Sequence, residues 1–230
     1  RVYNDAKGQI GTVYTSIIHN GDLYLGTNQG LFVKSRKSSG DFDFVEGTSG
    51  QVWALKIIDD QLFCGHDLGT LIIRGGKIKT KIYEANGTWD FKKIENTDLI
   101  LQGNYSGLHI LENKSGAWKY RNKIQGFDIS SRFFHFADQK LYVNHELRGL
   151  HSLELSKDFT KVERLNTIDS IDLGFGSNFI NFSNSFYYTS ANGVYKLAQS
   201  SGKFEKDSII SNILDNYNTT STLLAVNATD

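Results

Sequence analysis

The residues of this chain best suited to contacting a ligand form a chemically mixed set at one fixed offset. They stand eight residues before five similar segments, and they are Tyr14, Trp53, Asp90, Arg132 and Ser177. Tyr and Trp present flat apolar faces with a polar tip, which suit stacking on sugar rings, whereas Asp and Arg make directional hydrogen bonds. Packing of the two aromatic rings between repeats, and a salt bridge between Asp90 and Arg132, are the structural alternatives.

A second group of candidates lies in the short polar loops that follow the same segments. Amides, charged groups and hydroxyls suit neutral polyols, which need partners that donate and partners that accept. Any solvated turn is also polar, so a purely structural role for each loop residue stays open. From these loops the predicted ligand-binding set takes Asn28, His66, Asp67, Tyr105, His145, Glu146 and Arg148, which join Tyr14, Trp53, Asp90 and Arg132.

Enzyme chemistry finds little support. Cys64 and His66 share a strand face and could form a thiolate pair, but Cys64 occupies an apolar position of its repeat. Asp67, Asp90 and Glu146 could in principle act on a glycosidic bond. Phosphate-loop, nucleophile-elbow, dinucleotide and metal-ligand spacings are missing from the sequence. We therefore predict a non-enzymatic protein with no catalytic residue, cofactor or metal, and we keep a carbohydrate-active lyase or hydrolase as a less favoured alternative.

Composition narrows the classes of partner. Among 230 residues, 25 Lys and Arg balance 25 Asp and Glu, and the pI is about 7.2. This balance gives no reason to expect nucleic-acid binding, and the apolar runs are too short to insert in a membrane. A single cysteine excludes an internal disulfide framework.

The elements that must position these residues come from internal repetition. Each repeat has a polar residue, three apolar residues, a short loop and then a glycine. The glycines are Gly30, Gly69, Gly107, Gly149 and Gly193, so the spacings are 39, 38, 42 and 44 residues. This period, with four short strands in each unit, is typical of a β-propeller blade. We predict an all-β propeller with blades at about 12–47, 51–87, 88–127, 128–169 and 170–210.

Segments outside the repeat cores carry further predictions. Residues 77–83 alternate lysines with apolar residues, which predicts an outermost strand whose lysines block edge-to-edge pairing; an anion site is the alternative. Residues 1–10 and 220–226 contain terminal strands that either complete a blade or belong to a larger ring, and we favour the larger ring. A short helix is expected after Ser208.

The stretch from Gly21 to Phe32, which contains Leu-Tyr-Leu-Gly-Thr followed by Gly-Leu, resembles the two-component regulator propeller repeat. The likeness weakens in 61–71 and 98–108, and the last two repeats keep only the spacing. The resemblance implies a sensor propeller on the periplasmic or extracellular side of a bacterial membrane protein. Such regulators are hybrid histidine kinases or membrane-tethered helix-turn-helix transcription factors, common in Bacteroidetes. Their ligand is often an oligosaccharide.

Taken together, we expect a ligand-sensing module for signal transduction and transcription regulation that binds an oligosaccharide. The resemblance allows a homodimer formed through the full-length receptor. We expect no nucleic acid and no membrane to be contacted by this segment. A protein interaction scaffold that uses the same face is the main alternative.

Overall fold

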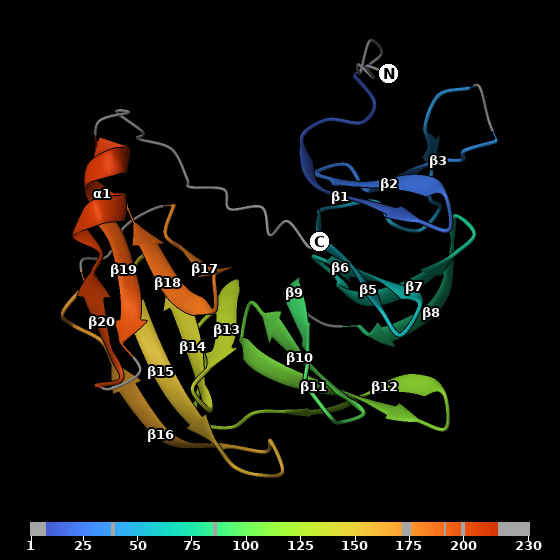
Figure 1. Cartoon of the computed structure of the whole chain (residues 1–230). Helices are drawn as coiled ribbons and strands as arrows, with labels where there is room; N and C mark the ends of the chain where they lie inside the picture. The colour runs from blue at the N-terminus through green and yellow to red at the C-terminus, as the bar shows by residue number, and fades with distance from the viewer. Residues whose placement is uncertain are drawn as a thin grey trace. The chain divides into compact units, whose positions relative to one another are not determined.

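The computed structural model describes residues 8–37, 40–84, 87–171, 176–190, 192–198 and 201–215. In this part of the chain the strands form five four-stranded antiparallel sheets, each built from strands consecutive in sequence (Figure 1). The predicted all-β repeat is confirmed. The first sheet comprises β1 (Val13–His19), β2 (Asp22–Thr27), β3 (Leu31–Lys34) and β4 (Asp43–Phe44); the second β5 (Val52–Ile58), β6 (Gln61–His66), β7 (Gly69–Arg74) and β8 (Lys77–Tyr83); the third β9 (Thr88–Lys93), β10 (Leu99–Asn104), β11 (Gly107–Lys114) and β12 (Ala117–Lys123); the fourth β13 (Phe133–Ala137), β14 (Lys140–His145), β15 (Gly149–Leu155) and β16 (Val162–Thr167); the fifth β17 (Asn178–Phe182), β18 (Ser185–Ser190), β19 (Gly193–Ala198) and β20 (Lys203–Lys206).

The chain divides into two compact units. The first unit, residues 1–123, holds the first three sheets, and the second unit, residues 124–230, holds the other two. In the first unit the faces of neighbouring sheets bury apolar side chains against one another: Tyr24 and Leu31 of the first sheet pack with Leu62 of the second. Phe63 of the second sheet packs likewise with Phe91 of the third. Burial of these alternating apolar positions is the main stabilising term for such stacked sheets.

Two-residue turns set the register of most sheets. Asn20, Asp59 and Asp138 each begin such a turn with positive φ angles of 52°, 48° and 46°. Positive φ at both turn positions matches the right-handed twist of the strands, which explains the Asn, Asp and Gly residues found there. The third sheet differs, because its first hairpin closes where the Ile94 amide donates to the Leu99 carbonyl and leaves 95–98 as the loop.

The predicted short helix is present as α1 (Ser208–Asp215) and packs on β19 (Figure 1). The Ser211 hydroxyl accepts from the Val194 amide at 3.0 Å and donates to the Val194 carbonyl at 3.3 Å. The helix is therefore held to the strand by a side chain that satisfies two backbone groups. The predicted terminal strands at 1–10 and 220–226 fall mainly on residues 1–7 and 216–230, which lie outside the described residues.

The strand pairing corrects one register predicted from the sequence. In each of the first three sheets, the pairing between the first and second strands leaves out one residue. The residues left out are Tyr14, Trp53 and Trp89. The residue equivalent to Tyr14 and Trp53 is therefore Trp89, whereas Asp90 pairs with Gly103 one position further along. The reason is the longer hairpin loop at 95–98. Asp98 lies in this loop, so a count of eight residues back from it reaches Asp90 instead of Trp89.

Candidate functional site

Four aromatic side chains of the first unit lie against one another in a continuous series, which we name the aromatic row: Tyr14, Trp53, Trp89 and Tyr105. Tyr14 stacks on Trp53 with ring centroids 4.8 Å apart and an interplanar angle of 21°. Trp53 contacts Trp89 at 4.6 Å, and Trp89 contacts Tyr105 at 4.7 Å. The row thus joins residues from three consecutive sheets.

The β-bulges explain why these rings meet. A bulged residue is left out of the ladder, and the local bend re-aims its side chain. Tyr14, Trp53 and Trp89 each occupy the bulge near the start of the first strand of their sheet. Three equivalent bulges in successive sheets therefore direct three rings to one end of the first unit.

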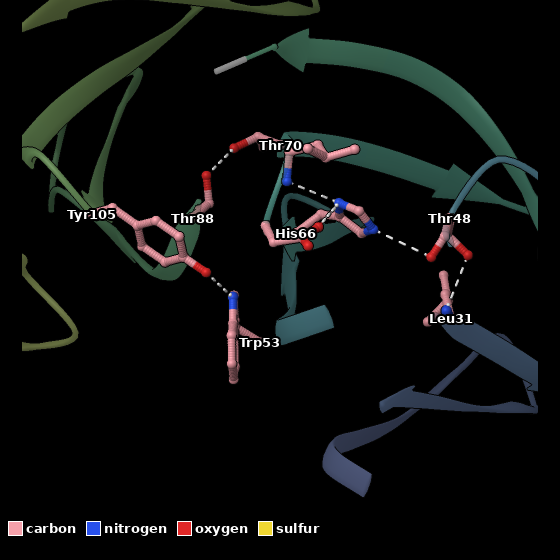
Figure 2. Close-up of polar contacts among 9 residues, drawn as sticks. Leu31, Thr48, Trp53, His66, Thr70, Thr88 and Tyr105 are labelled. Atoms are coloured by element: carbon pink, nitrogen blue, oxygen red, sulfur yellow. Dashed lines mark hydrogen bonds and ion pairs between the residues drawn. The ribbon is translucent and has the colours of Figure 1, made fainter. Parts of the chain in front are cut away.

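Tyr105 closes the row from a loop between β10 and β11. Its hydroxyl accepts a hydrogen bond from the Trp53 indole N–H at 2.8 Å (Figure 2). Its backbone amide donates to the Gly87 carbonyl at 3.1 Å. A Cβ at position 87 would overlap the Tyr105 ring, so only glycine lets the ring pack on this backbone.

The row is partly open to solvent. Tyr14 is 41% exposed, and Trp53, Trp89 and Tyr105 are half-buried. Burial raises the pKa of Tyr105, so its hydroxyl stays protonated at neutral pH and keeps a hydrogen to donate while it accepts from Trp53. The row therefore offers apolar ring surface together with phenol groups that can bond to hydroxyls.

A closed circuit of hydrogen bonds joins four buried polar side chains, one of which is next to Trp89 in the sequence. The Thr88 hydroxyl lies 2.9 Å from that of Thr70, as Figure 2 shows, and Thr70 donates to Gln102 Oε1 at 2.6 Å. Gln102 Nε2 donates to Asn104 Oδ1 at 2.9 Å, and Asn104 Nδ2 donates back to Thr88 at 3.3 Å. All four residues are fully buried. Because each group both donates and accepts around the ring, the bonds strengthen one another and fix the start of β9 beside Trp89.

The predicted histidines have a shared structural position. His66 Nδ1 accepts from the Leu68 amide at 3.0 Å, and His145 Nδ1 accepts from the Leu147 amide at 3.2 Å. Thr27 and Ser190 bond in the same way to the amide two residues on. His66 Nε2 also lies 3.2 Å from the Thr48 carbonyl, as Figure 2 shows. The same bond recurs in four of the five loops, so it stabilises the turn, and the ligand-binding role of the two histidines stays a prediction.

The other predicted residues of the first unit are Asn28, Asp67 and Asp90, and each makes a polar contact of its own. Asn28 Oδ1 accepts from the Thr12 amide at 2.7 Å, which ties its loop to the start of β1. Asp67 Oδ1 lies 2.7 Å from His66 Nδ1, and the Asp67 carbonyl accepts from the amide of Gly87, the glycine on which Tyr105 packs, so Asp67 is close to the row. Asp90 pairs with Lys56 at 3.4 Å.

The predicted residues of the second unit make a different set of contacts. Glu146 Oε1 accepts from the Gly176 amide at 3.0 Å, and the Arg132 guanidinium lies over the Phe133 ring at 5.0 Å. Ser177 is buried and accepts from Asn144 at 2.6 Å, while Arg148 is exposed. The structure describes these residues within their own unit, and their ligand-binding role stays a prediction.

Trp89 is the site residue that the sequence interpretation missed. Counting back from polar residue Asp98 led to Asp90, whereas the strand pairing, in which Gly103 lies opposite Asp90 and Asn104 opposite Thr88, leaves Trp89 at the bulge. The signal was present, because Trp89 is one of only three tryptophans in the chain.

Cys64 lies in the core. The thiol is fully buried, and burial raises its pKa to about 12, so it remains a neutral thiol at physiological pH. Among the residues that the structure describes, no group of three or more His, Cys, Asp or Glu could hold a metal ion. Within the same residues, no helix has the length and apolar character needed to cross a membrane.

Comparison with known proteins identifies the fold. No family model and no curated protein matches the chain. The WD40 β-propeller domain of Doa1 superposes with a TM-score of 0.59 at 12% identity, over 83% of this chain and 66% of that one. The five sheets match blades of β-propellers.

Two other matches are bacterial proteins outside the cytoplasm. The extracellular domain of the hybrid two-component system BT4673 from B. thetaiotaomicron aligns with a TM-score of 0.60 at 17% identity, over 89% of this chain. PorZ, a surface component of the type-IX secretion system of Porphyromonas gingivalis, aligns with a TM-score of 0.56 at 11% identity, over 88% of this chain. This chain spans 28% of each of those chains, so its sheets correspond to part of a larger propeller protein.

Proposed function

We propose that this chain is a ligand-sensing propeller segment of an extracytoplasmic receptor and that it binds an oligosaccharide on the aromatic row. The stacked series of Tyr14, Trp53, Trp89 and Tyr105 carries the proposal. Pyranose rings offer apolar C–H faces to such rings and hydroxyls to the groups beside them. The likeness to the BT4673 extracellular domain supports a sensor role at the level of the fold.

The polar groups beside the row suit neutral sugars. Asp67 can accept from sugar hydroxyls, and the Tyr105 hydroxyl can donate to them. Asp67 also places a carboxylate near the row, which disfavours an acidic sugar at this position. Binding would act as a signal only if the ligand prefers one arrangement of the receptor over another.

The test is binding of a panel of neutral oligosaccharides, followed by one matched pair of variants. We expect one glycan class to raise the melting temperature of the protein through preferential binding to the folded state. Tyr14→Ala should then weaken that binding by about tenfold or more, because the outer ring of the row is lost.

Phe182→Ala is the matched control. Phe182 is an aromatic residue of the second unit and is 64% exposed, so its truncation removes an exposed ring without touching the row. Equal loss of affinity in the two variants would refute the aromatic row as the site. Hydrolysis or elimination of the bound glycan would instead establish an enzyme, and a stable protein partner with no glycan response would favour the scaffold.

A further inference from the structure

Two neighbouring outermost strands, β8 and β12, carry a cluster of basic residues. β8 carries Lys77, Lys79 and Lys81, and β12 carries Lys119, Arg121 and Lys123, with no acidic residue in either strand. The two strands contact each other. Six cations therefore gather on adjacent strands of a chain whose formal charge is zero.

Carboxylates do little to neutralise four of these lysines, namely Lys77, Lys79, Lys81 and Lys119. Lys81 approaches Glu84 at 3.8 Å, but both side chains are more than half exposed, at 55% and 67%, so the pair adds little. Glu112 lies opposite Lys119 in the ladder yet pairs with Lys114 at 2.9 Å. Among the described residues, no carboxylate lies within ion-pair distance of Lys77, Lys79 or Lys119.

Aromatic rings join the two basic strands. Tyr83 at the end of β8 stacks on Tyr120 of β12 at 4.9 Å and 28°, and His109 lies 5.3 Å from Tyr83. Burial, followed by the charge of Lys123, lowers the pKa of His109 to about 4, so this ring is neutral at pH 7. The cations therefore flank a small uncharged aromatic surface.

Protection of a sheet edge does not account for the number of cations. Lysines on an edge strand prevent pairing with another chain, but the other outermost strands do without such a run. β16 carries one acidic and one basic residue, β4 carries one acid and no base, and β20 carries two lysines with one glutamate. The excess on β8 and β12 needs a further reason.

We propose that β8 and β12 bind an extended acidic polysaccharide, of the sulfated or uronate type. Bulges at Lys79 and Arg121 interrupt the alternation of side chains, so the cations spread over both strands and do not form a single row. Six cations on two adjacent strands are complementary in charge to a linear polyanion, and the Tyr83 and Tyr120 rings offer stacking surface to its sugars. Ile78 and Ile82 of β8 pack into the cores instead of facing outward, so the surface lacks the aliphatic anchors that favour a lipid bilayer. This surface is separate from the aromatic row, and it does not require the proposed function.

The experiment measures binding of dextran sulfate and polygalacturonate to the intact chain, with neutral dextran as the blank. Both polyanions should bind at about 50 mM salt and weaken strongly at about 300 mM, which roughly halves the Debye length. The triple variant Lys77→Glu, Lys79→Glu and Lys119→Glu should weaken binding by at least about tenfold.

A matched triple, Lys157→Glu, Lys161→Glu and Lys203→Glu, changes net charge equally at exposed lysines of the second unit and should stay within about twofold of the parent protein. If charge reversal disturbs folding, the corresponding Lys→Gln triple replaces it. Equal weakening by the two triples, or a preference for single-stranded DNA or phosphatidylglycerol vesicles over both polysaccharides, would overturn the proposal. Tyr14→Ala should leave polyanion binding intact, so this proposal and the proposed function can fail separately.

Discussion

The two units build the same four-stranded sheet but begin it differently. In the three sheets of the first unit a bulge interrupts the opening ladder at Tyr14, Trp53 and Trp89, and the three rings stack in series. In the second unit the ladders starting at Phe133 and Asn178 run without a register shift. One extra residue per strand therefore decides whether a repeat contributes to an aromatic surface.

The buried polar contacts of the two units differ in the same way. The first unit has the closed circuit of Thr70, Thr88, Gln102 and Asn104, in which each bond supports the next. In the second unit Asn144 donates to Ser177 at 2.6 Å and accepts from Tyr188 at 3.4 Å. The closed circuit holds the start of β9 more rigidly than the two bonds of Asn144 hold the second unit. We therefore infer that the first unit is the better preorganised of the two.

Alanine at equivalent loop glycines should give the largest contrast between the units. Gly69 has a φ of +130°, and an added Cβ would overlap the Tyr83 carbonyl, which is backbone and cannot move alone. Gly193 has a similar φ of +131°, but its added Cβ would meet side-chain atoms only, the flexible end of Lys206 at 2.8 Å and the Ser211 hydroxyl oxygen at 2.9 Å, which can shift further than backbone. We expect Gly69→Ala to lower the free energy of unfolding by about 3 kcal/mol or more and Gly193→Ala by about 1 to 2 kcal/mol. Urea denaturation measures both, and equal losses would remove the distinction.

Breaking the polar contacts should give the next largest effect. Gln102→Leu leaves the Thr70 hydroxyl and Asn104 Oδ1 buried without their partner, at a cost of about 2 to 3 kcal/mol. Asn144→Leu interrupts the simpler set and should cost about 1 to 2 kcal/mol. Hydrogen exchange can locate the loss, which for Gln102→Leu should concentrate in β9 and β10. A uniform loss across both units would contradict the local role of the circuit.

Much of the fold could be predicted from the sequence, because each repeat carries its own local signals for strands and turns. The apolar triplets, the glycine after each loop and turn residues such as Asn20 and Asp59 each specify a strand or a hairpin through properties of single residues. Regular spacing then links these local signals into repeated four-stranded sheets.

The candidate site could be predicted less fully from the sequence. A bulge at Trp89 depends on pairing with β10, and the longer loop at 95–98 hides the offset from a residue count. His66 was predicted as a ligand contact from its place in a polar loop, which stays a prediction, and residue type alone did not reveal that its Nδ1 also accepts from the amide two residues on, as the Thr27 hydroxyl does. Register and side-chain direction are tertiary properties, so residue type and spacing alone did not specify them.

Acid should destabilise the first unit through His109. Burial lowers the pKa of His109 to about 4 from 6.5, so the unfolded chain binds a proton more readily than the folded one. Stability is then full above pH 6.5 and falls as the pH drops toward 4, by about 2 kcal/mol between pH 7 and pH 5. His109→Gln should remove this part of the pH dependence in denaturant titrations. His151, whose pKa burial also lowers, is the counterpart in the second unit. A profile unchanged by His109→Gln would show that other groups control it.

The smallest expected difference between the two units concerns the loss of stability when Tyr14 or Arg132 is truncated. Both are exposed residues that stand eight positions before a repeat segment. Tyr14→Ala removes a stacked ring that is 41% exposed and should cost about 1 kcal/mol. Arg132→Ala removes an exposed side chain lying over Phe133 and should stay within about 0.5 kcal/mol. Thermal unfolding of the two variants measures the difference. Tyr14 should therefore combine a small loss of stability with a large loss of ligand affinity, which is the pattern of a residue placed for binding. If Tyr14→Ala instead cost as much as Gln102→Leu, the aromatic row would be an element of the core, and the bulges would serve packing between sheets.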